Sequence, residues 1–356
     1  MINVGIIGFG YWGPNIARNV SLTPGLKLQA ICDLREDRRR EASLNHPSAK
    51  IYSDAKELIL ADNIDAVAVI TPVFTHYELG KLALECGRHL FMEKPFASTV
   101  AQAEKLINIA ERRNLLIMVD HTFLFTGAVR KMRQIIDSNE LGNLFFYDSV
   151  RVNLGLFQHD VNVIWDLAPH DISIMDYLIS ERPKAVSAVG TRHFNSGYED
   201  VAYITVFLNT TLIAHFHCNW LTPVKIRKTL ISGDKKMLVW DDLSPDEKLK
   251  VFDKGVEIVN GNDGDENKGI YELLVSYRSG DVYIPKVDNT EALRLEMQYF
   301  ADCLEKRQKP FNDGESGLRV VNILEAANRS MKAGGRKIKL HNDESCTGYI
   351  AGGKRR

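Results

Sequence analysis

A glycine-rich loop near the start of the chain places the strongest constraint on how this sequence can fold. The loop follows an apolar run, Val4–Ile7, and opens a helical pattern from Asn15 to Val20. It reads Gly8-Phe9-Gly10-Tyr11-Trp12-Gly13. Glycines at this spacing permit a tight turn and a close approach of the backbone to a pyrophosphate, and the helix N-terminus supplies free N–H groups. The loop therefore predicts a dinucleotide site; the alternative is a strand–turn–helix that binds nothing.

The residue that ends the next apolar run favours NAD over NADP. The run Leu28–Cys32 is followed by Asp33 and Leu34, about twenty residues after the loop. A carboxylate there can accept hydrogen bonds from both ribose hydroxyls and repels a 2′-phosphate. We assign Asp33 and Leu34 to the cofactor site. Arg35 and Arg38 leave NADP possible.

Short apolar runs alternate with helical patterns through the first 120 residues. This alternation predicts a parallel sheet with helices on both faces, a doubly wound Rossmann α/β domain over residues 1–120. Near-continuous apolar strands fit a sheet that is buried on both sides. The expected strands are Val4–Ile7, Leu28–Cys32, Ala66–Ile70, His89–Met92 and Leu115–Val119, and the helices include Tyr77–Cys86 and Val100–Arg113.

After about residue 121 the pattern changes to strands with few intervening helices. We expect a C-terminal α+β domain over 121–340, with an open, mainly antiparallel sheet that binds substrate and mediates oligomerisation. An uncovered sheet face implies a homodimer or homotetramer. Residues 341–356 are expected to be a flexible tail. The expected elements are helices at Ala128–Ser138, Asp171–Ser180, Glu291–Lys306 and Ser316–Ala333, and strands at Leu144–Leu154, Lys184–His193, Val201–Trp220, Lys225–Ser232, Lys236–Trp240 and Lys248–Val259.

Charge and cysteine content narrow the class of protein further. The 356 residues include 45 Lys and Arg against 46 Asp and Glu, a balance that argues against a nucleic-acid partner. No apolar stretch reaches the ~20 residues of a membrane span, and no signal peptide is expected. Five scattered cysteines indicate reduced thiols in the cytoplasm. His215 and His217 alternate on a strand without a third ligand at a telling spacing, so no metal is expected.

Polar residues follow the third and fourth apolar runs, at the sheet edge where such folds bind ligands. Thr71-Pro72 ends the third run and is interpreted as a wall beside the nicotinamide, with His76 a few residues on. Glu93-Lys94-Pro95 ends the fourth run. The Lys94 ammonium at that edge could stabilise an oxygen that gains negative charge. Taken alone, Glu-Lys-Pro is more often a surface turn.

The segment Trp165-Asp166-Leu167-Ala168-Pro169-His170-Asp171 contains the best candidate for an acid/base group. A histidine among carboxylates is the usual base of near-neutral pKa. Asp166 lies four residues before His170 and could orient it on one helix face. Proline is comfortable only in the first turn of a helix, so Asp166 could instead be the cap of a helix that begins there.

These motifs, in this order, resemble the Gfo/Idh/MocA oxidoreductase family over residues 1 to about 335. The resemblance implies a Rossmann domain followed by an open-sheet domain, and hydride transfer between nicotinamide and a secondary hydroxyl. It also implies Lys94 at the reacting oxygen, His170 as acid/base with Asp166, and Glu93 and His76 near the cofactor. Val161–Trp165 and Ala168-Pro169 depart from the glycines and Gly-Val that many relatives have there.

A strand-like stretch in the second half suggests the substrate. Lys225 and Arg227 are two residues apart, so on a strand they share one face, which suits a diphosphate or is simply an exposed face. Asn219–Lys228 and Gly233–Met237 resemble a branch of the family that oxidises nucleotide sugars. That branch implies C3 of UDP-N-acetylglucosamine or its uronate as the target, in polysaccharide biosynthesis. The substrate residues we expect are Asn153, Trp165, His170, Lys225 and Arg227. The alternatives are an inositol or free-sugar dehydrogenase and a non-catalytic NAD-binding sensor.

Overall fold

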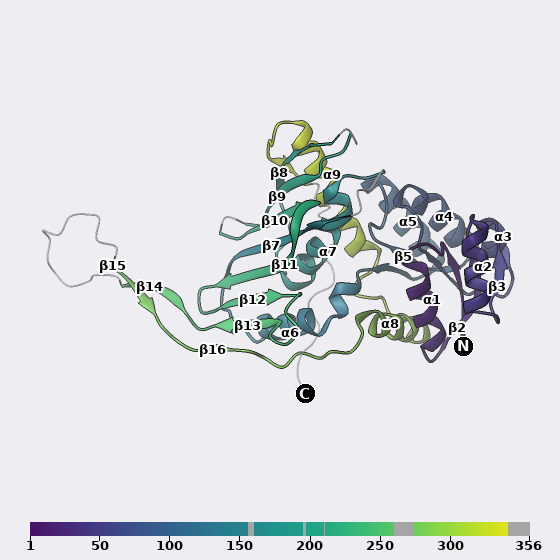
Figure 1. Cartoon of the computed structure of the whole chain (residues 1–356), viewed down its shortest axis with the longest axis horizontal. Helices are drawn as coiled ribbons and strands as arrows, with labels where there is room; N and C mark the ends of the chain where they lie inside the picture. Colours follow the sequence, from purple (N-terminus) through teal and green to yellow (C-terminus); the bar gives the residue numbers. More distant parts are fainter. Residues whose placement is uncertain (156–159, 195–196, 210, 260–273, 341–356) are drawn as a thin grey trace, which may run out of the picture.

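The first 120 residues form a six-stranded parallel sheet with strand order β3-β2-β1-β4-β5-β6. This unit lies on the right in Figure 1. The computed structural model describes residues 1–155, 160–194, 197–209, 211–259 and 274–340. The sheet and its helices comprise β1 (Ile2–Ile7), α1 (Gly13–Leu22), β2 (Leu26–Cys32), α2 (Glu36–Asn45), β3 (Lys50–Tyr52), α3 (Ala55–Leu60), β4 (Ala66–Val69), α4 (Val73–Glu85), β5 (His89–Glu93), α5 (Val100–Arg113) and β6 (Ile117–Asp120).

Both faces of this sheet are buried, as its near-continuous apolar strands predict. Along β4, Ala66 and Ala68 belong to one hydrophobic core, and Val67 and Val69 belong to another on the opposite face. Successive side chains of a strand point to opposite faces, so a strand covered on both sides must be apolar throughout. The expected Rossmann-type α/β fold is confirmed.

The second unit is a nine-stranded sheet, with order β16-β13-β12-β11-β7-β10-β9-β8-β17 in the described part of the chain. Its pairs are antiparallel except β7 with β10. This confirms the expected mainly antiparallel sheet. Its strands are β7 (Leu144–Leu154), β8 (Ala185–Thr191), β9 (Val201–Phe207), β10 (Ile213–Asn219), β11 (Leu221–Gly233), β12 (Met237–Asp241), β13 (Leu249–Phe252), β16 (Val282–Tyr283) and β17 (Ile338–Lys339).

Two of the expected strands are divided in the structure. The run from Val201 to Trp220 is the hairpin β9–β10, which turns near Asn209. The run Lys248–Val259 is split between β13 and β14 (Gly255–Val259). β14 pairs with β15 (Leu274–Arg278) in a separate two-stranded sheet that projects from the body (Figure 1). The expected tail at 341–356 lies outside the described residues.

The remaining helices fill one face of the second sheet and the junction between the two units. They are η1 (Thr122–Phe125), α6 (Gly127–Asp137), α7 (Val163–Leu178), α8 (Ala292–Lys306) and α9 (Gly314–Lys332). α8 returns to the first unit, where Phe300 packs on Phe91 with ring centroids 5.4 Å apart. The Arg18 guanidinium on α1 also donates to both carboxylate oxygens of Glu291, just before α8. The C-terminal helices thus complete a unit that the expected division at residue 120 had assigned to the first part of the chain alone.

Candidate active site

The glycine-rich loop has the geometry that its sequence requires. Gly8 has φ of +99°, and a Cβ there would lie 2.2 Å from the Ile70 carbonyl oxygen. A Cβ on Gly13 would lie 2.3 Å from the Gly8 carbonyl oxygen. A Cβ on Gly10 would meet only the tip of Arg35, at 4.0 Å. Gly8 and Gly13 thus shape the turn, and Gly10 leaves the open space that the pyrophosphate of a dinucleotide would use.

The acidic residue after β2 lies directly against this loop. Asp33 accepts hydrogen bonds from the backbone N–H of Phe9 at 2.8 Å and of Arg35 at 2.9 Å. Arg39 donates to the carbonyl oxygens of Asp33 and Leu34, and the Leu34 side chain is exposed. Asp33 is therefore held at the edge where the adenosine ribose of NAD would bind.

Within the loop, Tyr11 and Trp12 behave differently. Tyr11 is exposed. Trp12 is the N-cap residue of α1, and its indole N–H donates to the Asp120 carboxylate at 2.9 Å. This hydrogen bond fixes the loop to the end of β6, and sequence spacing alone could not predict it.

His76 links two turns at the cofactor edge of the sheet. Its Nδ1 lies 2.9 Å from the Pro95 carbonyl oxygen and its Nε2 lies 2.8 Å from the Thr71 carbonyl oxygen. The ring is 0% exposed, and burial lowers its pKa. Thr71 and Pro72 remain at the edge, where Pro72 precedes α4. His76 therefore holds these turns from behind the edge, and its place near the cofactor, which the resemblance implies, stays a prediction.

Lys94 at the end of β5 faces the first turns of α7. Its ammonium donates to the backbone carbonyl oxygen of Asp166 at 3.1 Å and lies 3.9 Å from the Asp166 carboxylate. The same carboxylate accepts the Trp220 indole N–H at 3.0 Å. Lys94 and Asp166 are thus brought together across the interface of the two units.

The structure corrects the two expected roles of Asp166. α7 begins at Val163, and its cap is Asn162, whose side chain accepts the Trp165 backbone N–H at 3.3 Å. Pro169 therefore lies inside the helix, where Asn162 and the buried apolar face of α7 stabilise the earlier start. Asp166 is neither the cap nor bonded to His170. Its partners are Lys94 and Trp220.

His170 lies one turn further along α7, near three cations that are each paired with a carboxylate. Its ring packs edge-on against Phe123, with centroids 5.0 Å apart. Burial lowers the pKa of His170 well below its ordinary value, and the nearby charges of Lys94, Arg151 and Arg227 lower it further. The imidazole is therefore neutral at physiological pH, the form that can accept a proton.

The substrate residues expected from the sequence occupy different places around His170. Arg227 lies with its guanidinium carbon 5.1 Å from the Phe123 ring centre, and it donates to Asp242 at 2.7 Å. Lys225 is exposed on the same strand, Asn153 is partly buried near the end of β7, and Trp165 is buried in the first turn of α7. Arg227 thus lies beside the reacting region, and Lys225 lies further out.

Phe123 and Arg151 are site residues that sequence reasoning missed. The Arg151 guanidinium lies 4.6 Å from the Phe123 ring centre and forms two 2.8 Å hydrogen bonds with the buried Asp171. Arg151 pairs with Arg227 across β7 and β11. A signal for Phe123 was present, because it lies three residues after the end of β6, at the edge of the sheet where such folds bind ligands. Arg151 could be found only from the register of the second sheet.

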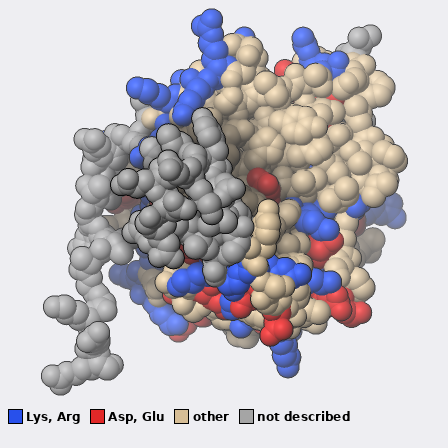
Figure 2. All heavy atoms as spheres, turned by 90° about the vertical axis from the view of Figure 1, so that its left-hand side faces the viewer, with Lys and Arg blue, Asp and Glu red and all other residues tan. Residues whose placement is uncertain are grey.

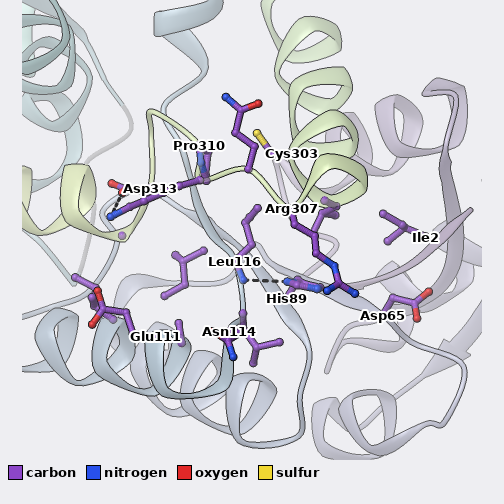
Figure 3. Close-up of a pocket in the computed structure, with 18 of the residues that line it drawn as sticks. Ile2, Asp65, His89, Glu111, Asn114, Leu116, Cys303, Arg307, Pro310 and Asp313 are labelled. Atoms are coloured by element: carbon purple, nitrogen blue, oxygen red, sulfur yellow. Dashed lines mark hydrogen bonds and ion pairs between the residues drawn. The ribbon is translucent and has the colours of Figure 1, made fainter. Parts of the chain in front are cut away.

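Two cavities lie at different edges of the first sheet, and only the smaller one is beside this site. A cavity of about 220 Å³ lies between the start of α4 and the start of α7, lined by residues that include Phe74, Asn162 and Trp165. A larger cavity of about 890 Å³ lies at the opposite, amino-terminal edge of the first sheet (Figure 3). There the ring of His89 accepts the Leu116 backbone N–H at 2.9 Å, and Arg307 lies nearby. The larger cavity is remote from Lys94 and His170 and has no part in the chemistry proposed below.

Other site classes find no support in the described residues. His215 and His217 lie on the open face of the second sheet, where Tyr203 stacks on His217 with ring centroids 4.4 Å apart. No group of three or more His, Cys, Asp or Glu side chains among the described residues is arranged to hold a metal ion. None of the helices that the structure describes has the length and apolarity needed to cross a membrane.

The fold and the glycine-rich loop define an NAD-binding Rossmann oxidoreductase with a second, sheet-based domain. Sequence comparison gives the same assignment: residues 2–121 match the oxidoreductase family with NAD-binding Rossmann fold, and residues 129–239 match the GFO/IDH/MocA C-terminal domain. The chain belongs to the Gfo/Idh/MocA oxidoreductase family, as the resemblance in its motifs predicted.

Relatives of known activity are distant and act on different substrates. Myo-inositol 2-dehydrogenase of Thermotoga maritima is 24% identical over 95% of this chain and 98% of its own length. UDP-N-acetylglucosamine 3-dehydrogenase of Acidithiobacillus ferrooxidans is also 24% identical, over 90% of this chain and 94% of its own. The solved structure of the Acidithiobacillus enzyme superposes with a TM-score of 0.78 at 21% identity, covering 93% of this chain and 98% of that one. The family relationship therefore supports a sugar or polyol oxidoreductase.

An oxidoreductase from Agrobacterium radiobacter, solved in complex with NAD+, shares the fold with a TM-score of 0.77. It is 18% identical, with 95% of this chain and 98% of that one covered. The open space at Gly10 and the anchored Asp33 fit the same cofactor here. NAD, when bound, supplies the carbon that accepts or returns a hydride.

Proposed function

We propose that this chain oxidises a secondary hydroxyl of an anionic nucleotide sugar, C3 of a UDP-hexosamine or its uronate, with NAD. The observation that carries the proposal is the set of cations around His170. Arg227 is held on the Phe123 ring beside His170, and its buried Nε has no hydrogen-bond acceptor among the described residues. A buried guanidinium N–H that lacks an acceptor is costly, so a substrate oxygen is a natural partner.

This geometry supports the roles that we propose for the reacting residues. The neutral imidazole of His170 accepts the hydroxyl proton, and the Lys94 ammonium stabilises the oxygen as it gains negative charge. Asp166 holds Lys94 at 3.1 Å through its backbone carbonyl oxygen and is itself fixed by Trp220. We assign the cofactor to the loop from Gly8 to Gly13 with Asp33, Leu34, Thr71, Pro72 and the end of β5. We assign the substrate beyond its reacting carbon to Asn153, Trp165 and Lys225.

The substrate class is tested with a panel of UDP-N-acetylglucosamine, its uronate, myo-inositol and glucose. We expect NADH formation with a UDP-sugar only. Mass spectrometry of the sugar, which detects the loss of a hydrogen pair, also reports turnover when NADH stays bound and is recycled. Turnover of myo-inositol alone would place the chain with the inositol dehydrogenases that it also resembles. A chain that binds NAD and converts no sugar would be the non-catalytic sensor.

Arg227→Gln should separate the anionic substrate from neutral ones. Loss of a charge-assisted hydrogen bond of about 1.5–3 kcal/mol predicts a rise of roughly 10- to 100-fold in KM for the UDP-sugar. Lys228→Met is the matched control, because Lys228 pairs with Asp241 on the opposite face of the same strand. Equal effects of the two variants on KM would refute a substrate role for Arg227.

We also propose that a second copy of the chain covers the open face of the second sheet, giving a homodimer or a dimer of dimers. Val189, Tyr203, Ile213 and Ile226 are exposed on strands of this sheet. Figure 2 views the molecule from the side on which the sheet lies, and a broad area there has few charged side chains. Exposed uncharged areas of this kind are typical of interfaces between subunits.

Light scattering should therefore give a dimer or larger for the wild type and a monomer for Tyr203→Glu, because each subunit would bury an unpaired carboxylate in the interface. A monomeric wild type would overturn this assembly.

The four described cysteines are free, which supports the cytoplasm as the place of action.

A further inference from the structure

Three carboxyl groups meet behind the cofactor loop, and none of them takes part in the proton or hydride transfer described above. Glu93 ends β5, Asp120 ends β6, and the two are register neighbours in the sheet. Glu296 reaches the same place from α8: its Oε1 accepts a hydrogen bond from the Asn312 amide, which also donates to the carbonyl oxygen of Val119 just before Asp120. Asp120 is 2% exposed and Glu296 is 0% exposed. Three carboxyl groups buried this close together repel one another strongly if all of them are ionised.

The hydrogen bonds indicate how the protons are shared. Asp120 accepts the Trp12 indole N–H at 2.9 Å and the Thr122 hydroxyl. In contrast, Oε2 of Glu93 and Oε2 of Glu296 are buried, and no described residue donates to them. A buried carboxylate oxygen without a donor is costly, whereas a protonated carboxyl can itself donate. This pattern favours Asp120 as the single carboxylate, with the two glutamic acids protonated beside it.

Electrostatics support this distribution. Burial, followed by the charge of Asp120, raises the pKa of Glu93 and of Glu296 well above the ordinary value. Lys94, which follows β5, opposes the shift at Glu93, and the Thr122 hydroxyl opposes it at Glu296. His121 follows Asp120, and burial lowers its pKa to about 4, so it adds no positive charge at neutral pH. Asn312 donates to Oε1 of Glu296 at 3.2 Å.

The position of this cluster connects it to cofactor binding. Trp12 is the N-cap residue of α1, and its carbonyl oxygen accepts the Asn15 backbone N–H at 3.0 Å. Trp12 follows Gly10 by two residues, so the hydrogen bond from its indole to Asp120 fixes the position of the loop relative to the end of β6. Glu93 immediately precedes Lys94, and Glu296 brings α8 into the same network.

We propose that Asp120 and Glu296, with Glu93, form a carboxyl hub that positions the glycine-rich loop through Trp12 and so sets the affinity for NAD. Asp120 and Glu296 act as positioning residues, since neither touches the reacting atoms. The inference rests on NAD binding and not on the proposed sugar. NAD affinity is measured without a sugar, so failure of the hub and failure of the substrate proposal are distinguishable.

The hub predicts a weaker affinity for NAD at alkaline pH. The pKa of each glutamic acid in the folded protein lies above that in the unfolded chain. The protonated glutamic acids therefore stabilise the fold at low pH, and this contribution is lost as pH rises through their pKa values in the folded protein. Loss of a proton places a second negative charge against Asp120 and removes a donor. Glu296→Gln keeps a neutral donor at the same position and removes the titration.

The test is the Kd for NAD, measured by titration calorimetry between pH 6.5 and 9 on the full chain. We expect Trp12→Phe and Asp120→Asn each to raise Kd about tenfold at pH 7, the cost of a charge-assisted hydrogen bond. The double variant should also show about tenfold and not hundredfold, because one interaction is lost in both. In the wild type Kd should rise about fivefold or more toward pH 9, and in Glu296→Gln by at most about twofold.

Glu305→Gln is the control for charge removal, since Glu305 is exposed near the end of the same helix. It should follow the wild-type pH curve. The hub is wrong if Glu296→Gln retains the wild-type pH dependence, or if the effects of Trp12→Phe and Asp120→Asn multiply. Should Asp120→Asn fail to fold, the pH curves of Glu296→Gln and the wild type decide the question alone.

Discussion

Replacing His170 with asparagine should lower kcat by about 10²- to 10⁴-fold, the usual contribution of a placed acid/base group. NAD should still bind with a Kd within about threefold of the wild type, because His170 belongs to α7 and is not part of the glycine-rich loop. Steady-state kinetics on the sugar that the panel identifies, together with calorimetry for NAD, measure both quantities.

The pH dependence gives the His170 prediction a second readout. Burial and the cations around it lower the pKa of His170 well below the ordinary 6.5, so the acid limb of kcat/KM in the wild type should lie below pH 6.5. This limb should disappear in His170→Asn. His215→Asn, on the open face of the second sheet, should leave both rate and limb in place. A wild-type acid limb at or above pH 6.5 would contradict the prediction that His170 is a neutral base whose pKa is lowered by burial and nearby cations.

Lys94→Met should have an effect of similar size on kcat, roughly 10²- to 10³-fold, because it removes the charge that stabilises the developing alkoxide. Its distinguishing mark is the pH profile. The Lys94 ammonium lowers the pKa of His170, so its removal should move the acid limb toward higher pH. Lys94→Arg keeps the charge, and its acid limb should stay near the wild-type position even though its rate falls.

Lys105→Met is the matched control for Lys94→Met, since Lys105 is an exposed lysine on α5. It should change neither kcat nor the profile. Wild-type rates in Lys94→Met would remove Lys94 from the reaction and leave the chain with the non-catalytic sensor as the better description.

The parts of the fold that sequence could predict are those fixed by local pattern. The apolar runs at Val4–Ile7 and Ala66–Ile70 had to be buried strands, and the loop between Gly8 and Gly13 had to be a tight turn against a helix. Helix ends were harder to predict, because two nearby residues can be of a suitable type for the N-cap. Asn162 is the N-cap of α7 and Pro169 lies inside the helix, although Asp166 was an equally suitable N-cap by residue type.

The parts that sequence could not predict depend on contacts between distant segments. Lys94 and Asp166 are 72 residues apart, and Trp12 and Asp120 are 108 residues apart. No local rule joins them. The grouping of Arg151 and Arg227 on Phe123 follows from the antiparallel register of β7 and β11, which is set only when the whole sheet forms.

The return of α8 to the first unit has a consequence for chimeric enzymes built from this family. α8 carries Phe300 against Phe91, and Glu291 just before it binds Arg18 on α1. A graft of residues 1–120 onto a foreign substrate domain would therefore carry an incomplete nucleotide module with a bare apolar surface. The transferable module is discontinuous: cofactor preference should move between scaffolds only when the segment from Glu291 to Lys306 travels with the first 120 residues.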